Sequence, residues 1–123
     1  MFLKLAHSNL DIYTCSRELV LSCYRLTKKF PDSEKFALMQ QFRRAAVSIH
    51  LNIAEGCSRK SLTERKRYYE IARGSTIEID TILEIAFHLK YCSEVELQPT
   101  GNLVIRTFQM LSAMIDKKNG NIG

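Results

Sequence analysis

Apolar residues recur at intervals of three and four positions along most of the chain, which is the spacing of one face of an α-helix. Pro31 separates the first two such segments because it disfavours helical geometry at Phe30, and Gly56 is a natural helix end. The spacing predicts helices over about 9–30, 33–56, 62–91 and 101–117. The predicted inward positions are Ile12, Cys15, Leu19, Val20, Cys23, Leu26 and Phe30; Leu38, Phe42, Ala45, Ile49 and Ile53; Leu62, Tyr69, Ala72, Ile79, Leu83, Ala86 and Leu89; and Val104, Phe108, Leu111 and Ile115.

Short polar motifs mark where these helices begin. Ser61–Glu64 and Ser93–Glu96 both have the Ser-x-x-Glu spacing of a capping box, in which the two side chains satisfy free backbone N–H groups. Asp32 offers a further N-cap ahead of the second helix. Pro99 and Gly101 closely follow the second box, so we expect an irregular turn before the last helix.

Four amphipathic helices joined by short connections bury their stripes most simply in an antiparallel up-down-up-down bundle. The 123 residues are enough for one hydrophobic core, and a single domain over residues 1–123 is expected. Only 5 Gly and 2 Pro are present, too few for an all-β protein with a turn every ~8 to 12 residues. The predicted fold class is therefore all-α, a four-helix bundle.

Several classes of protein do not fit the sequence. No stretch approaches ~18 uncharged apolar residues, and Met1–Leu10 lacks the pattern of a signal peptide, so we expect a cytoplasmic protein with no membrane span. Cys15 and Cys23 are ~12 Å apart along one predicted helix, too far for a disulfide. No cysteine or histidine spacing is typical of zinc. Reduced thiols, and no metal or cofactor, are the expectation.

The net charge of +5, from 18 Lys and Arg against 13 Asp and Glu, comes entirely from one segment. Between Arg43 and Arg73 there are eight bases and three acids, whereas the remainder is balanced. Such a segment can contact the phosphates of a nucleic acid, and the adjoining Tyr68 and Tyr69 could stack on bases. A solvated helix start is the alternative. The candidate nucleic-acid-binding residues are Arg43, Arg59, Lys60, Arg65, Lys66 and Arg67.

A polar stripe runs beside the apolar face of the second predicted helix. An antiparallel pairing would place residue 44 opposite about residue 74 and bring Arg44 within reach of Glu78. We expect a hydrogen-bonded layer that fixes helix register, with a ligand or RNA contact and a subunit contact as alternatives. Gly74 suggests a close approach of the second helix, because glycine costs ~1 kcal/mol within a helix. The candidate residues of this layer are Arg44, Ser48, Asn52, Glu55, Arg73, Ser75 and Glu78.

Sequence signatures of enzymes are mostly absent. There is no Glu-x-x-His pair for a di-iron bundle, no P-loop and no Gly-x-Ser-x-Gly motif. Arg44 followed by His50 is similar to the Arg-x4–6-His motif of the HEPN ribonucleases. However, six positions rotate these side chains ~120° apart around a helix, so they cannot point at one phosphate. We expect no catalytic residues and no enzymatic activity.

Several segments together resemble a known family. They are Phe30-Pro31, Gln41–Gly56, which ends in Asn-Ile-Ala-Glu-Gly, and Tyr69–Glu78, which contains Ile-Ala-Arg-Gly-Ser. Over about residues 5–117 the chain resembles the bacterial four-helix-bundle family named for the protein encoded in intervening sequences of 23S ribosomal RNA genes. His50 is a departure, because relatives often carry Pro there.

The resemblance implies a compact bundle without enzymatic activity that assembles as a ring, in known relatives a homopentamer. The chain is similar as well to the accessory protein of diversity-generating retroelements, a basic pentameric barrel that binds nucleic acid and a reverse transcriptase. The partners implied are thus further copies of the chain, RNA or DNA, and a protein such as a reverse transcriptase.

Two functions remain open on these grounds. The first is an oligomeric protein that binds nucleic acid through its basic surface, and the second is a scaffold that recognises a protein while its charge serves solubility. Strong salt dependence of nucleic-acid binding would distinguish them. Tyr13, Tyr24 and Phe36 are candidates for subunit contacts but could equally lie in the core.

Overall fold

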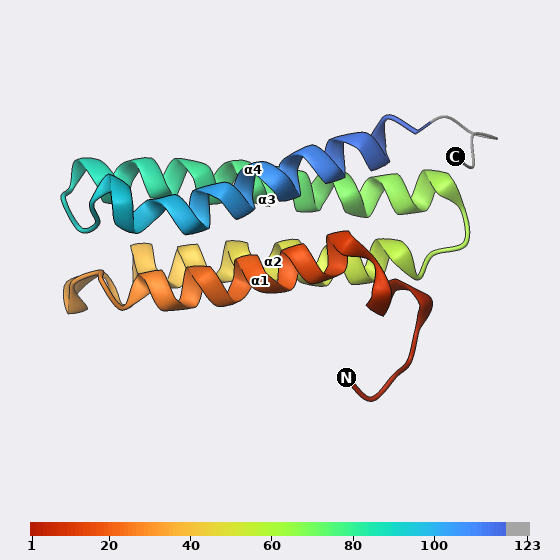
Figure 1. Cartoon of the computed structure of the whole chain (residues 1–123), viewed down its shortest axis with the longest axis horizontal. Helices are drawn as coiled ribbons and strands as arrows, with labels where there is room; N and C mark the ends of the chain where they lie inside the picture. Colours follow the sequence, from red (N-terminus) through yellow and green to blue (C-terminus); the bar gives the residue numbers. More distant parts are fainter. Residues whose placement is uncertain (118–123) are drawn as a thin grey trace.

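The computed structural model describes residues 1–117, and these form an antiparallel four-helix bundle with no strand (Figure 1). The helices are α1 (Asp11–Thr27), α2 (Leu38–Cys57), α3 (Leu62–His88) and α4 (Glu94–Ile115). Two short 3₁₀ helices, η1 (Ala6–Asn9) and η2 (Asp32–Glu34), precede α1 and α2. The predicted fold class is confirmed. No helix among residues 1–117 is long and apolar enough to cross a membrane.

Each helix packs against two others in the order α1, α2, α3, α4 and back to α1. In Figure 1, α1 and α2 lie on one side of the bundle and α3 and α4 on the other. Most of the predicted apolar stripes are buried, and Leu19, Phe42, Ile79 and Leu111 are fully enclosed. The four cysteines are free thiols, and burial raises the pKa of Cys23 to about 12.

The stripe predicted for the last helix is wrong at Phe108, which is 37% exposed while the neighbouring Thr107 is fully buried. The side of α4 that packs against α1 instead carries two buried threonines, Thr100 and Thr107. The Thr100 and Ser22 hydroxyl oxygens are 2.7 Å apart, and the Thr107 hydroxyl lies 3.3 Å from the Cys15 sulfur. Because these buried polar atoms contact one another, their burial in the core does not carry the free-energy cost of an unpaired polar group.

The start of α4 also differs from the prediction. The helix begins at Glu94 and not at 101, because the Ser93–Glu96 motif forms a complete capping box. The Ser93 hydroxyl accepts from the Glu96 N–H at 3.2 Å, and the Glu96 carboxylate accepts from the Ser93 N–H at 2.9 Å. Pro99 lies inside the helix. Its missing N–H affects only the carbonyl of Val95, near the exposed helix start where water can bind it.

The other helix ends are shorter than predicted. The segment expected to begin a helix at 33 forms η2 instead, and α2 starts only after Ala37, whose backbone (φ −128°, ψ −104°) is not helical. The first helix ends at Thr27 and not near residue 30. The third ends at His88, three residues before 91, because Lys90 adopts a left-handed conformation with φ of 64°.

Gly56, and not Gly74, is the glycine that permits a close approach. A Cβ added at Gly56 would lie 2.7 Å from Cε1 of Tyr69, whereas one at Gly74 would have nothing within 4 Å. The expectation that the second helix packs closely on Gly74 is therefore wrong. Gly74 is exposed in the middle of α3.

We predict opposite effects of alanine at these two glycines. Gly74→Ala should raise the free energy of unfolding by about 0.5 to 1 kcal/mol, because alanine is the better helix former and meets no neighbour. Gly56→Ala should lower it by about 1 to 3 kcal/mol through overpacking against Tyr69. Urea denaturation of both variants measures the difference, and a Gly56→Ala protein as stable as the parent would contradict the packing described.

Candidate nucleic-acid interface

One end of the bundle collects most of the cations of the basic segment. The turn Ser58–Ser61 joins α2 to α3, and the antiparallel order of the helices brings the C-terminal end of α4 to the same end of the molecule (Figure 1). The Lys66 ammonium donates to the carbonyl oxygen of Lys117. We call this cluster the basic end. Its members are Arg59, Lys60, Arg65, Lys66, Arg67 and Lys117.

Internal contacts hold part of this cluster in place. The Arg59 guanidinium donates to the Glu55 carboxylate and to the Tyr68 hydroxyl, both at 2.9 Å, and lies 4.9 Å from the centre of the Tyr68 ring. The Arg65 Nε donates to the carbonyl of Arg59 at 2.6 Å. These contacts fix the two guanidinium groups, and Glu55 offsets part of their charge.

The two tyrosines that follow differ in their environment. Tyr69 is buried, and its hydroxyl lies 3.5 Å from the Cys57 sulfur. Burial and this contact with Cys57 raise the pKa of Tyr69. Tyr68 is half-buried beside Arg59. Tyr69 is thus unavailable for base stacking, which leaves Tyr68 as the aromatic neighbour of the basic end.

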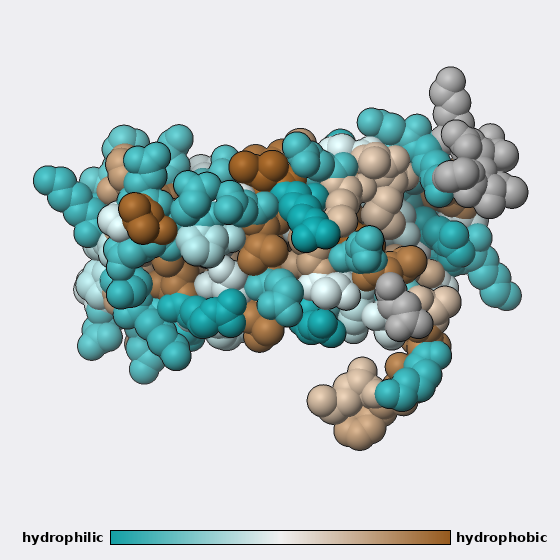
Figure 2. Space-filling view, viewed as in Figure 1, coloured by the Kyte–Doolittle hydropathy of each residue, from teal (hydrophilic) through white to brown (hydrophobic). Residues whose placement is uncertain are grey.

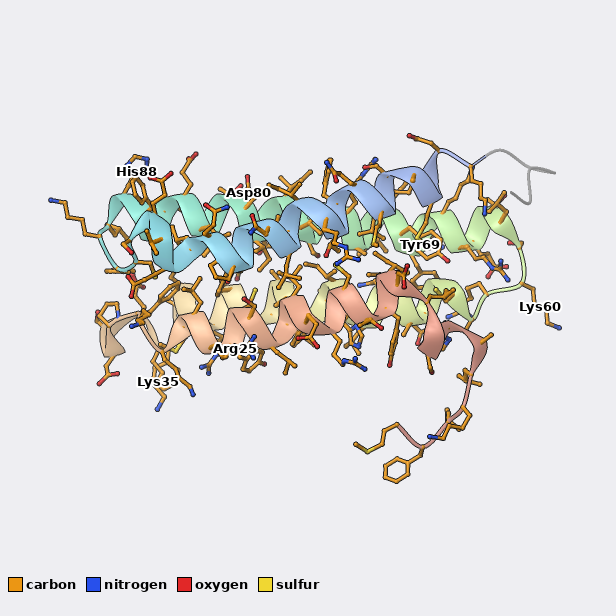
Figure 3. All side chains as sticks on the ribbon, in the orientation of Figure 1. Arg25, Lys35, Lys60, Tyr69, Asp80 and His88 are labelled. Atoms are coloured by element: carbon orange, nitrogen blue, oxygen red, sulfur yellow. The ribbon has the colours of Figure 1, made fainter. Side chains whose placement is uncertain are left out.

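Two cations of the basic end have exposed side chains that can contact a ligand. Lys60 and Arg67 are exposed and make no ion pair or side-chain hydrogen bond within residues 1–117. Figure 3 shows Lys60 pointing outward from the turn, while Tyr69 points into the bundle. The N-terminus of α3 lies beside them, capped by Ser61, whose hydroxyl accepts from the Glu64 N–H at 3.1 Å.

Arg43, which the sequence grouped with these residues, lies elsewhere. It precedes Arg59 by 16 residues on α2, or ~24 Å of helix. Its guanidinium donates to the Thr27 hydroxyl at 3.0 and 2.8 Å and stacks 4.8 Å from the centre of the Tyr24 ring. Arg43 therefore ties α2 to the end of α1 and is not part of the basic end.

The expected polar layer is smaller than predicted. The Ser75 hydroxyl donates to the Ser48 hydroxyl at 3.2 Å, and the Asn52 amide donates to the Ser48 carbonyl at 2.8 Å. Ser48 therefore lies opposite Ser75. The predicted pairing of residue 44 with about residue 74 would have placed Ser48 opposite about residue 70, so the observed register differs by about five residues, or ~1.4 helical turns. Among the seven candidates, these three side chains form one cluster between α2 and α3, and Glu78 makes a separate contact with α2 through Gln41.

Of the other four candidates, three contact residues outside this cluster, and the Arg44 side chain makes no hydrogen bond or ion pair within residues 1–117. Glu55 pairs with Arg59, and the Glu78 carboxylate accepts from the Gln41 amide. Arg73 donates to the Ser112 hydroxyl at 3.3 Å and approaches the Phe108 ring, both on α4. Arg44 is exposed on the outer side of α2.

The comparisons with known proteins agree with this architecture. Residues 8–113 match the family described as 23S rRNA-intervening sequence protein. The chain belongs to this family. A solved structure from Bacteroides thetaiotaomicron VPI-5482, described as a protein with unknown function from the S23 ribosomal protein family, has the same fold with a TM-score of 0.79. It is 22% identical, and the alignment covers 85% of this chain and 98% of that one. None of the curated proteins matches the sequence.

In this member of the 23S rRNA-intervening sequence protein family, His50 faces α1. Its Nδ1 lies 2.6 Å from the Ser16 hydroxyl, and its ring is 4.5 Å from that of Tyr13. Burial lowers the pKa of His50, and the charges of Arg17 and His7 lower it further. Arg44 lies on a different side of α2, so the two side chains of the HEPN-like pair do not converge.

We predict that His50 makes the bundle less stable in mild acid. The folded state resists protonation of His50, so the free energy of unfolding should fall as the pH decreases from the ordinary pKa of 6.5 through the lowered value. His50→Gln should lose less stability than the parent between about pH 7.5 and 5.5. Urea denaturation across this range measures it, with His88→Gln, at an exposed position, as the control. Identical pH profiles for the parent and His50→Gln would contradict the prediction.

Proposed function

We propose that this chain is a non-enzymatic cytoplasmic protein that assembles with copies of itself, as a homopentamer, and binds the phosphate backbone of RNA or DNA through its basic end. The observation that carries the nucleic-acid part is the exposure of Lys60 and Arg67 beside two fixed arginines. Phosphate contacts require only such positioned cations. The N-terminus of α3 adds a favourable dipole for an anion at the same place.

The arrangement supports contacts with the backbone more than sequence-specific readout. The two cations without an internal partner, Lys60 and Arg67, lie at the turn and in the first turns of α3, where they can contact phosphate groups. Tyr68 is the aromatic side chain available beside Arg59, and it is half-buried. We therefore expect binding that depends on salt and varies little with base sequence.

A non-enzymatic role agrees with the position of the Ser16 and His50 pair. Although their side chains contact each other as a nucleophile and a base would, Ser16 is fully buried in the α1–α2 packing. No substrate could reach its hydroxyl without opening the bundle. The pair therefore supports the packing of α2 on α1.

We predict that the two free cations dominate nucleic-acid binding. Lys60→Gln with Arg67→Gln should weaken binding of an RNA or DNA oligonucleotide and lower the slope of log affinity against log salt by about 2 per subunit. Fluorescence anisotropy over a salt series measures both quantities. The control is Arg25→Gln with Lys28→Gln, which removes the same charge from exposed positions on α1 and at its C-terminal end.

Equal loss of affinity in the two double variants would show that net charge and not the basic end is responsible. No binding by the parent protein at low salt would exclude nucleic acid as the partner and favour a protein-interaction scaffold, with a protein partner such as a reverse transcriptase.

A further inference from the structure

A groove of about 870 Å³ lies over the outer side of α2. The Tyr24 side chain bounds it on the α1 side, and Phe36, which follows η2, bounds its end. Phe36 is 82% exposed and Leu51 58% exposed. Tyr24 and Phe36, which the sequence left open as core or contact residues, are therefore surface residues. We call this surface the α2 groove; Met39, Arg44 and Val47 also line it.

A second, smaller groove of about 380 Å³ lies between α3 and α4. Its apolar lining includes Ile77 and Ile105, which are 54% and 56% exposed, and Phe108. We call this surface the α3–α4 face. The α2 groove is lined by α1, η2, α2 and the residues between them, so the two surfaces share no helix. Figure 2 shows apolar residues reaching the surface between hydrophilic ones on the side of the molecule that it draws.

The charges of the two surfaces are complementary. The α2 groove contains Lys35, Arg43 and Arg44 against the single acid Asp32, whereas Asp80 is the charged residue lining the α3–α4 face. Neither Arg44 nor Asp80 forms an ion pair within residues 1–117.

The two surfaces lie on different sides of the bundle. Figure 3 shows Asp80 on the side of α3 and α4, and Lys35 on the side of α1 and α2. Arg73 approaches the α3–α4 face at Phe108, but its guanidinium contacts that ring and Ser112.

We propose that the α3–α4 face of one copy docks into the α2 groove of the next copy, with Ile105 and Ile77 against the apolar groove residues and Asp80 near Arg44. This inference rests on the self-assembly proposed above and names the surfaces that make it. Each apolar side chain leaves water on contact, and the unpaired charges gain partners. A second copy is favoured over another protein because both halves of the contact are present on this chain.

The contact joins two different surfaces, so it is heterologous and each copy can bind one neighbour on each side. Such a contact can repeat from copy to copy, and the assembly closes as a ring when the rotation between neighbouring copies adds up to a full turn. Neither surface contains a residue of the basic end, so Lys60 and Arg67 stay exposed in the assembly.

Two single substitutions test this arrangement. Leu51→Glu places a charge in the α2 groove and leaves the α3–α4 face intact, and Ile105→Glu does the reverse. Both positions are more than half exposed, so the bundle should still fold. In sedimentation, each variant alone should have the mass of one chain, 14.2 kDa. An equimolar mixture should form a one-to-one dimer of about 28 kDa, because the two intact surfaces can meet.

Val95→Glu is the matched control, because Val95 is 82% exposed on α4 and lines neither surface; it should assemble as the parent does. A second pair uses the charges: Arg44→Glu and Asp80→Arg should each weaken association about tenfold or more, and the double variant should recover part of it.

The inference is overturned if either Leu51→Glu or Ile105→Glu keeps the mass of the parent assembly, since the surface that carries the substitution would then not be needed for assembly. It is also overturned if the mixture stays monomeric. A parent protein that is itself monomeric would contradict the self-assembly proposed above, whereas a parent assembly with unaffected variants contradicts only these surfaces.

Discussion

The packing of Tyr69 against Gly56 is the constraint on which the rest of the structure depends. The absence of a side chain at Gly56 lets the tyrosine ring lie against the backbone of α2 just before the turn. This contact sets the register of α2 on α3, and the Ser48 and Ser75 hydroxyl groups then meet farther along the pair. Any larger residue at Gly56 must displace the ring or separate the two helices.

The same packing builds the basic end. With Tyr69 turned inward toward Cys57, Tyr68 lies beside Arg59, and Arg65 reaches the carbonyl of Arg59. The arginines are thus held by the turn itself, while Lys60 and Arg67 extend from it. Because α4 runs antiparallel to α3, its end adds Lys117 to the cluster. The bundle therefore carries a cluster of cations at one end, and its grooves with exposed apolar residues lie along its sides.

The sequence allowed most of the fold to be predicted, because four helices with clear periodicity have few ways to bury their stripes. It misled at Pro99, because proline penalises a helix only where the lost hydrogen bond matters, and the Ser93 cap outweighs that loss near a helix start. Thr107 was not predicted as a core residue, because the apolar pattern counts threonine as polar. In the structure its hydroxyl is buried in contact with the Cys15 thiol.

The candidate site was predictable only where its residues are neighbours in sequence. The run from Arg59 to Arg67 lies on one turn and one helix start, so its clustering follows from the chain itself. Lys117 belongs to the cluster because α4 ends beside Lys66, and Arg43 does not belong to it because its guanidinium contacts Thr27. Both contacts depend on tertiary packing, which spacing along one helix cannot show. The polar stripe of α2 was likewise visible, but its partners depend on a register that the Gly56 contact determines.

The most direct test of this account is to map where a bound nucleic acid touches the protein. An oligonucleotide containing 4-thiouridine can be crosslinked to the full chain by ultraviolet light, and the modified peptides identified by mass spectrometry. We expect crosslinks at the turn and the start of α3, near Lys60, Arg67 and Tyr68, and at the end of α4 near Lys117. Crosslinks confined to the α2 groove or the α3–α4 face would contradict it.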